Sequence, residues 1–206
     1  MTDGLEDQGE GLEPRGHKDG RVRIDAQRNI DALLKAAIEV FSTSGVDAPV
    51  REIVEKAGVG IGTLYRHFPQ RSDLVAAVFR HEIDACADAA PILAAEHEPG
   101  EALAKWMQRY AAFLGTKRGL ASALHSGNPA FDPLPAYFQQ RLQPALQTLL
   151  ASAVAAGEVR TDFTAQDLLD AVASLCRSAY DHGPDHARRM VALLVDGLRY
   201  GKSRLD

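Results

Sequence analysis

The sequence predicts an all-α protein, and three observations support this. Apolar residues recur at spacings of three and four through almost the whole chain beyond residue 24, which is the period of amphipathic helices. No long stretch alternates apolar and polar residues, as a half-buried strand would. Apolar residues make up 46% of the chain and aromatic residues only 6%, a composition that suits closely packed helices. We therefore expect about nine helices.

Residues 1–24 differ from the rest because they combine little apolar content with five glycines and many acidic side chains. Such a segment cannot bury enough surface to offset the entropy of ordering, so we expect a flexible acidic tail. It does not resemble a secretory signal, and no apolar run approaches the ~20 residues of a membrane span. By default we expect a cytoplasmic protein that does not bind membranes.

The helical pattern begins at residue 25 and is interrupted at recognisable breaks. Gly45 is expected to end the first helix in a left-handed conformation. Pro49 suits the start of a short second helix, "VREIVEKA", which Gly58 ends. A third helix follows over residues 61–67, and a long fourth helix starts near Arg71 and runs past residue 90.

The second half continues with the same period. We expect helices in "EALAKWMQRYAAFLGT" and "GLASALHS", then a loop in "GNPAFDP". A long helix should follow over residues 135–156, kinked or split by Pro144. The last two helices are expected over residues 165–181 and 185–201.

The glycine-rich stretch "AGVGIGTLYRHF", residues 57–68, is the clearest candidate for a functional motif. A dinucleotide fingerprint needs a third glycine where Thr63 stands, and it must follow a strand. A phosphate-binding P-loop would need Gly-Lys-Ser or Gly-Lys-Thr, which the chain does not contain. The pattern instead fits a helix-turn-helix, with Gly58 at the turn and Gly60 and Gly62 allowing close approach to DNA.

The distribution of charge supports DNA binding only in one part of the chain. The net charge of −5 gives no argument for nucleic-acid binding. Residues 21–80, however, carry nine basic against seven acidic side chains and form the one positive block of the chain. Within it, Thr63, Tyr65 and His67 can bond phosphates, and Arg66 can reach a base edge or a phosphate.

Other chemistry finds little support in the sequence. His182 and His186 stand four apart, but Gly183 and Pro184 between them prevent one helix from presenting both, so no metal site is expected. His125 and Ser126 are adjacent and point apart on a helix, so we expect no catalytic residues. Cys86 and Cys176 lack CxxC spacing and are interpreted as small buried thiols. We expect no enzyme activity and no cofactor.

Residues 30–74 resemble the DNA-binding domain of the tetracycline-repressor (TetR) family, through "FSTSG", "VREI", "AGV", "GTLYRHF" and "SDL" at their spacings. The resemblance implies a three-helix DNA-binding domain, here residues 25–71. It implies a larger helical ligand-binding and dimerisation domain, here residues 72–206. It further implies a homodimer that binds a double-stranded DNA operator and usually represses transcription until a small-molecule effector binds.

By position, the resemblance gives Arg51 a base contact and Arg71 a phosphate contact. There are departures from the family pattern. Ile61 stands where many members carry a polar residue, and it could meet a thymine methyl group. Val54 replaces a usual alanine. Ala48 and Pro49 replace a usual threonine, so the second helix should lack a side-chain cap. The residues expected to contact DNA are Arg51, Gly60, Ile61, Gly62, Thr63, Tyr65, Arg66, His67 and Arg71.

The larger domain has a tentative ligand pocket between its middle helices, where most of its aromatic residues lie, although each of them could be ordinary core. A mostly apolar ligand is expected. The resemblance also implies that the last two helices pair with those of a second copy about a twofold axis. An activator, a ligand-independent regulator, and an all-helical enzyme or binding protein without a DNA role remain alternatives. The pocket candidates are Trp106, Tyr110, Phe113, Leu124, His125, Phe131, Tyr137 and Phe138, and the interface candidates are Leu168, Leu169, Val172, Leu175, Val191, Leu194 and Leu198.

Overall fold

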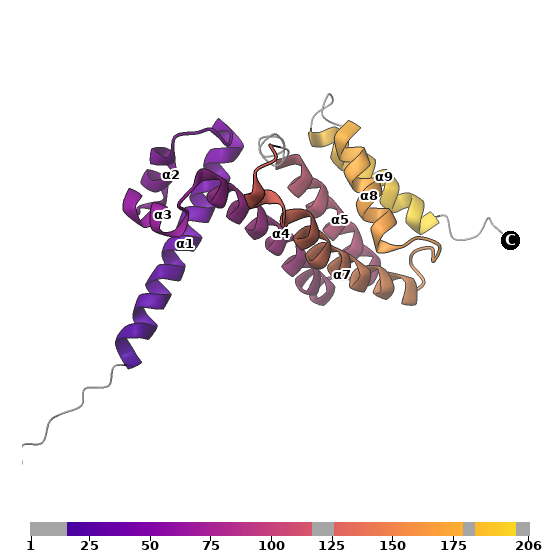
Figure 1. Cartoon of the computed structure of the whole chain (residues 1–206). Helices are drawn as coiled ribbons and strands as arrows, with labels where there is room; N and C mark the ends of the chain where they lie inside the picture. The colour runs from indigo at the N-terminus through magenta and orange to yellow at the C-terminus, as the bar shows by residue number, and fades with distance from the viewer. Residues whose placement is uncertain (1–15, 117–125, 179–183, 201–206) are drawn as a thin grey trace, which may run out of the picture.

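The computed structural model describes residues 16–116, 126–178 and 184–200. These residues form eight α-helices and one short 3₁₀ helix, with no strand among them, which confirms the all-α prediction (Figure 1). The short helix expected in "GLASALHS" falls almost entirely on residues 117–125, outside the described part. Among the described helices, none combines the length and the apolarity that a membrane span requires.

The first three helices form one unit. They are α1 (Gly16–Ser44), α2 (Val50–Ala57) and α3 (Ile61–His67). The start of α1 at Gly16 corrects the expectation of a flexible tail through residue 24. Extending a helix that is already nucleated costs little, so α1 can begin well before the apolar pattern of the sequence does. Gly45 ends α1 at a φ of 79°, as the sequence predicts, and its N–H donates to the Phe41 carbonyl.

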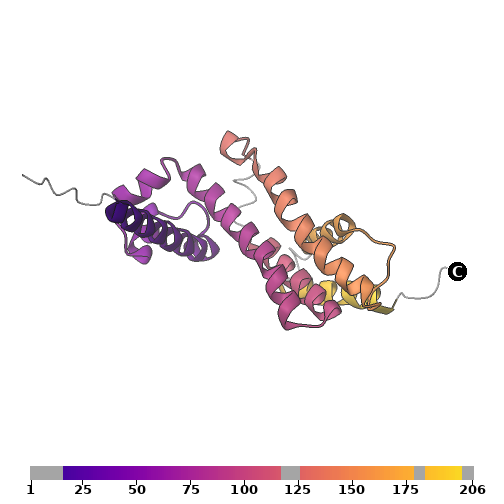
Figure 2. The same ribbon diagram turned by 90° about the horizontal axis from the view of Figure 1, so that it is seen from below.

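The long helix α4 (Arg71–Glu96) leaves this unit and enters the second half of the molecule (Figures 1 and 2). There it packs against α5 (Pro99–Thr116) and α7 (Leu134–Ala155), with the 3₁₀ helix η1 (Pro129–Phe131) beside it. The last two helices, α8 (Ala165–Ser178) and α9 (Pro184–Tyr200), lie side by side at the end far from α2 and α3 (Figure 1). Because α4 belongs to both halves, it is the element that can relate one to the other.

Pro144 does not split α7, so of the two predicted effects, a kink or a split, the split is wrong. The helix runs without interruption from Leu134 to Ala155, and α4 likewise continues through Pro91. Both proline rings lie on exposed positions of their helices. At such a site water can satisfy the carbonyl group that loses its helical donor, which reduces the cost of the proline.

The core of the second half joins α4, α5 and α8. Trp106 is completely buried, and its indole Nε1 donates a hydrogen bond to the Cys86 carbonyl at 2.9 Å. Cys86 and Cys176 are both buried and form no disulfide bond with each other, as the sequence predicts. The Cys176 sulfur lies 3.9 Å from the Ala111 carbonyl oxygen, and burial raises the pKa of this thiol. The two thiols thus act as small packing groups between helices.

Candidate nucleic-acid interface and regulatory half

The turn between α2 and α3 is built on one glycine in the left-handed region. Gly58 has φ 68° and ψ 28°, and its N–H donates to the Glu55 carbonyl at 3.3 Å. The next N–H, from Val59, donates to the Val54 carbonyl at 3.1 Å, which closes the end of α2. A side chain at position 58 would be strained in this conformation. The sequence prediction for Gly58 is therefore confirmed, and the turn sets the angle between the two helices.

Buried side chains hold both short helices on α1. Ile53 of α2 and Leu64 of α3 are 0% and 2% exposed, and Phe68 closes the end of α3 in the same core. An ion pair of 2.7 Å between Lys56 Nζ and Glu39 Oε2 ties α2 to α1 at the surface. The hydrogen bond from Lys56 lowers the pKa of the Glu39 carboxyl. As predicted, α2 begins after Pro49 without a side-chain cap.

The opposite face of α3 presents apolar and basic side chains to solvent. Ile61 is 52% exposed and Tyr65 is 49% exposed, and their spacing of four places them on one face of the helix. Arg66 is exposed as well, whereas Thr63 and His67 are half-buried. Together, Ile61 and Tyr65 give this face of α3 two adjacent exposed apolar side chains that a partner could cover.

Gly60 and Gly62 are not required by the fold. Gly60 has an ordinary φ of −73°, and a Cβ added at either position would meet no atom within 4 Å. Both residues are exposed at the start of α3. The open space beside them is thus available to a molecule that approaches from outside, as expected for close contact with a DNA backbone.

Arg51 lies on the exposed surface of α2. Its Nε is 3.4 Å from Glu55 Oε1, one turn further along the helix, and both side chains are largely exposed. Such a surface ion pair contributes little to stability, so Arg51 can exchange Glu55 for another partner without unfolding α2.

Arg71 bonds to backbone carbonyls of the loop before α2, and its predicted phosphate contact stays a prediction. Its Nε donates to the Val46 carbonyl at 2.7 Å, and its Nη2 donates to the carbonyls of Val46 and Ala48. The side chain is half-buried, and it fastens the loop between α1 and α2 to the first residue of α4. The resemblance could not show this, because the partners are backbone atoms more than twenty residues earlier in the chain.

A capping box fixes the start of α4 beside this clamp. The Gln70 N–H donates to Asp73 Oδ2 at 2.9 Å, and in return the Asp73 N–H donates to the Gln70 side chain. Together with Arg71, this box ties the orientation of α4 to the helix-turn-helix unit.

Four of the predicted pocket residues do gather. Trp106 and Tyr110 of α5 stack at 5.7 Å between ring centroids, and Tyr110 lies 6.0 Å from Phe138 of α7. Phe113 lies within 6.4 Å of both Tyr110 and Phe138. Burial raises the pKa of the Tyr110 hydroxyl.

Sequence reasoning missed a fifth member of this aromatic cluster. Phe79 of α4 lies 5.9 Å from Phe113, so the cluster reaches the helix that leads to α3. Phe131 is buried in η1. Leu124 and His125 lie outside the described residues.

Tyr137 is placed at the seam between α4 and α7 rather than in the aromatic cluster. Its hydroxyl donates to the Asp84 carboxylate at 2.7 Å, and burial followed by this hydrogen bond raises its pKa. Arg141 Nε donates to the same carboxylate at 2.7 Å, and its Nη2 donates to Asp88 at 2.7 Å. We call these four residues the α4–α7 latch. The sequence gives no signal for it, since polar residues on two separate helices do not reveal that they meet.

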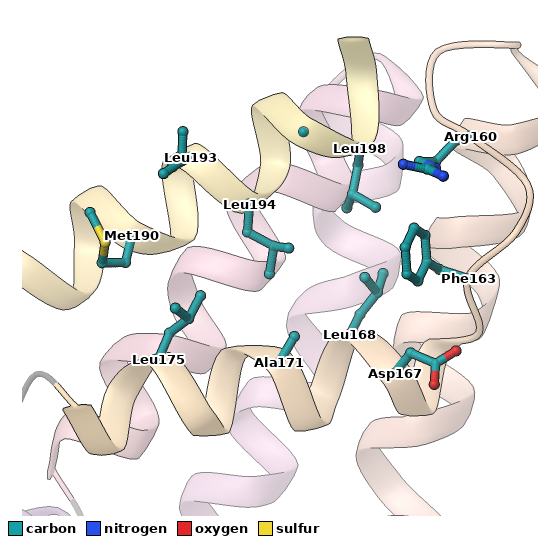
Figure 3. A pocket seen from close by; sticks show the side chains of 11 residues that line it. Arg160, Phe163, Asp167, Leu168, Ala171, Leu175, Met190, Leu193, Leu194 and Leu198 are labelled. Carbon is teal, nitrogen blue, oxygen red and sulfur yellow. The ribbon is translucent and has the colours of Figure 1, made fainter. Parts of the chain in front are cut away.

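The α8–α9 pair bounds an apolar groove of about 420 Å³. Figure 3 shows Leu168, Ala171 and Leu175 of α8 facing Leu194 and Leu198 of α9 across it. Three of the predicted interface residues, Leu169, Val172 and Val191, are buried inside the protomer and do not line the groove. The groove is also lined by Arg160, Phe163, Asp167, Ala171, Met190, Leu193 and Gly197.

Comparison with known proteins agrees with these features. A family model described as "Bacterial regulatory proteins, tetR family" matches residues 33–78, which contain α2, α3 and the turn. A second model, described as "Transcriptional regulator SbtR-like, C-terminal domain", matches residues 98–200.

Solved structures of relatives extend over most of the chain. A TetR transcriptional regulator from Streptomyces coelicolor is 39% identical, with a TM-score of 0.72, and the match covers 82% of this chain and 98% of that one. A TetR regulatory protein from Mycobacterium vanbaalenii is 35% identical, with a TM-score of 0.68, and the match covers 86% and 99%.

Curated relatives match over the N-terminal region. An HTH-type transcriptional regulator of Staphylococcus aureus is 36% identical over 64 residues, which is 31% of this chain and 35% of that protein. The chain thus spans about a third of the length of the curated relatives it matches. With both halves matched by family models and with full-length structural relatives above 30% identity, the chain belongs to the TetR family of transcriptional regulators, which are DNA-binding proteins and not enzymes.

Proposed function

We propose that the protein is a homodimeric, sequence-specific DNA-binding regulator that represses transcription and leaves its operator when a mostly apolar small molecule binds. The observation that carries the proposal is the exposed face of α3. Ile61 and Tyr65 are half-exposed there while Leu64 is 2% exposed, so α3 is anchored by one face and offers the other. A recognition helix needs this arrangement to enter the major groove.

The groove between α8 and α9 supports the homodimer. Leu193 is 65% exposed and Phe163 is 39% exposed, and both line the groove. An apolar surface of this kind on two adjacent helices is suited to pairing with its own copy about a twofold axis. Two copies would present two α3 helices, which can then occupy successive major grooves about 34–36 Å apart.

The aromatic cluster of α5 and α7 supports a mostly apolar ligand. With Phe79 of α4 included, the rings of the cluster come from three helices, α4, α5 and α7. A ligand that entered among these rings would contact apolar and aromatic surface, with few polar groups to satisfy. It would also press on the one helix that continues to the DNA-binding unit.

The coupling runs through two attachments of α4, one at its start and one near its middle. At its start, Arg71 and the Gln70–Asp73 box fasten α4 to the helix-turn-helix unit. Further along, Asp84 is held by Tyr137 and Arg141 of α7. A shift of α4 between these attachments would change the spacing of the two α3 helices in a dimer, and this would weaken operator binding.

The proposal is tested by anisotropy titration of the full chain against labelled duplexes from the region upstream of its own gene. We expect tight binding that competitor DNA of random sequence does not displace. Arg71→Ala should weaken binding to every duplex, because the loop before α2 loses the hydrogen bonds that hold it to α4. The affinity of Arg71→Lys should lie between those of the parent and Arg71→Ala. Equal affinity for all duplexes, or no binding, would overturn the proposal.

The ligand part needs a second experiment. A thermal-shift screen should return mainly apolar compounds, and a hit should release the chain from its duplex in the same anisotropy assay. Hits only among highly charged compounds would contradict the proposed ligand class. A promoter–reporter strain distinguishes repression from activation. Deletion of the gene for this protein should raise reporter expression if the protein is a repressor and lower it if the protein is an activator.

A further inference from the structure

Ile61 stands out among the side chains that α3 exposes. It is 52% exposed, although it is a branched aliphatic residue with no polar atom in its side chain. Tyr65, one turn later, is equally exposed, but its hydroxyl can bond water or a phosphate. Arg66 is charged and well solvated. Ile61 alone on this face gains nothing from water, so its exposure carries a cost that an external contact would remove.

The fold does not need Ile61 for packing. Leu64 and Phe68 anchor α3 in the core, at 2% and 7% exposure. The glycines on either side of Ile61, Gly60 and Gly62, have open space around them. The isoleucine therefore projects from a part of the helix that a partner can approach closely.

DNA offers one apolar group to a side chain in its major groove, the C5-methyl group of a pyrimidine. We infer that Ile61 is a specificity-determining residue that contacts such a methyl group, in the first place that of thymine. The inference rests on the proposed binding of operator DNA through α3. Burial of one methyl group against an aliphatic side chain corresponds to about a fourfold gain in affinity for each contact.

The test begins with selection of duplexes from a random pool by the full-length protein. In the enriched duplex, each thymine is then replaced by uracil, which removes the C5-methyl group and keeps the base-pairing pattern. We expect one thymine in each half-site at which this change weakens binding about fourfold. In Ile61→Ala the same replacement should have no effect, so that the two changes are coupled in a double-mutant cycle.

Ile92→Ala is the matched control. Ile92 is 57% exposed on α4, so this variant removes the same atoms from a similarly exposed site away from α3. The Ile92→Ala protein should lose as much affinity as the parent when the thymine is replaced by uracil. Circular dichroism and the thermal midpoint should be alike for both variants and the parent, which shows that the loss at Ile61 is not a loss of folding.

A final comparison identifies the source of the methyl group. At the sensitive position, a cytosine–guanine pair is tested with and without 5-methylation of the cytosine. A gain from 5-methylation without any loss from uracil supports the methyl contact but assigns it to methylated cytosine. A uracil penalty that persists in Ile61→Ala overturns the inference while DNA binding stands. The absence of both a uracil penalty at every thymine and a gain from 5-methylation overturns it as well. If no duplex is enriched, the proposed function itself fails.

Discussion

The hydroxyl of Tyr137 on α7 donates to the carboxylate of Asp84 on α4 at 2.7 Å. This bond and the two from Arg141 are the side-chain hydrogen bonds that join α7 to α4 in the described residues. They lie on the helix that leads from the aromatic cluster to α3. The α4–α7 latch therefore holds the helix through which the proposed coupling between ligand and DNA would run.

Tyr137→Phe removes one bond of the latch and leaves the ring in place. We expect the free energy of unfolding to fall by about 1 kcal/mol, the usual contribution of one such hydrogen bond. Urea denaturation followed by circular dichroism measures this change. Gln143→Ala, at an exposed position of α7, is the control and should unfold like the parent. Identical midpoints for Tyr137→Phe and the parent would show that the latch does not hold α4.

Tyr110 predicts a dependence of stability on alkaline pH. Burial raises its pKa above the ordinary value of about 10 that it has in the unfolded chain. Its contribution is therefore fully present below about pH 10 and is lost as the pH rises further, because only the unfolded chain then releases this proton. At about pH 11 the loss is about 1.4 kcal/mol for a tyrosine that stays protonated in the fold.

Urea unfolding of the parent and of Tyr110→Phe at about pH 8 and about pH 11 tests this dependence. The parent should lose more stability between the two pH values than the variant does. Equal losses would mean that Tyr110 ionises as readily in the folded protein as in the unfolded chain.

Two glycines of the helix-turn-helix should respond in opposite ways to alanine. Gly58→Ala forces a side chain into the left-handed region and should destabilise the fold by about 1 kcal/mol or more. Gly62→Ala adds a good helix former in open space and should stabilise it by about 0.5–1 kcal/mol.

The effect of Gly62→Ala on DNA binding should be opposite to its effect on stability. Gly62→Ala should weaken binding to the selected duplex despite its greater stability, because the added Cβ lies where the DNA backbone is expected. Thermal midpoints and anisotropy titrations, taken on the same preparations, give both values. A Gly62→Ala protein that binds DNA as tightly as the parent would place the backbone contact elsewhere.

Leu193 tests the homodimer. It is the most exposed of the large apolar side chains in the described part of the chain, at 65%, and it lines the α8–α9 groove. Leu193→Glu should place a charge in the dimer interface and shift the protein from dimer to monomer in analytical ultracentrifugation. Ile92→Glu introduces the same charge at a similarly exposed site on α4 and should leave the dimer intact. A parent protein that sediments as a monomer would contradict the homodimer.

Much of the fold follows from local rules that the sequence makes visible. The period of apolar residues gives the helices, and Gly45 and Gly58 mark their ends because both occupy the left-handed region. The helix-turn-helix is predictable for the same reason, since all of its determinants lie within about twenty residues. The start of α1 was placed too late, because local composition does not show how far a nucleated helix extends.

The rest depends on contacts between distant residues. The hydrogen bonds from Arg71 to the carbonyls of Val46 and Ala48 could not be predicted, because only the folded loop brings these atoms near. Helical period also cannot tell a face that packs on its own protomer from one that packs on a second copy. For this reason the interface set included Leu169 and Val191, which are buried within the chain.

The central claim is that α3 reads a specific DNA sequence, and selection from random duplexes by the full-length chain tests it most directly. The account predicts enrichment of a sequence with two inverted half-sites about 10–10.5 base pairs apart, or a multiple of this spacing. It also predicts that Tyr65→Ala will bind that sequence less tightly than the parent. Failure to enrich any sequence, or a Tyr65→Ala protein that binds the selected duplex like the parent, would contradict the account.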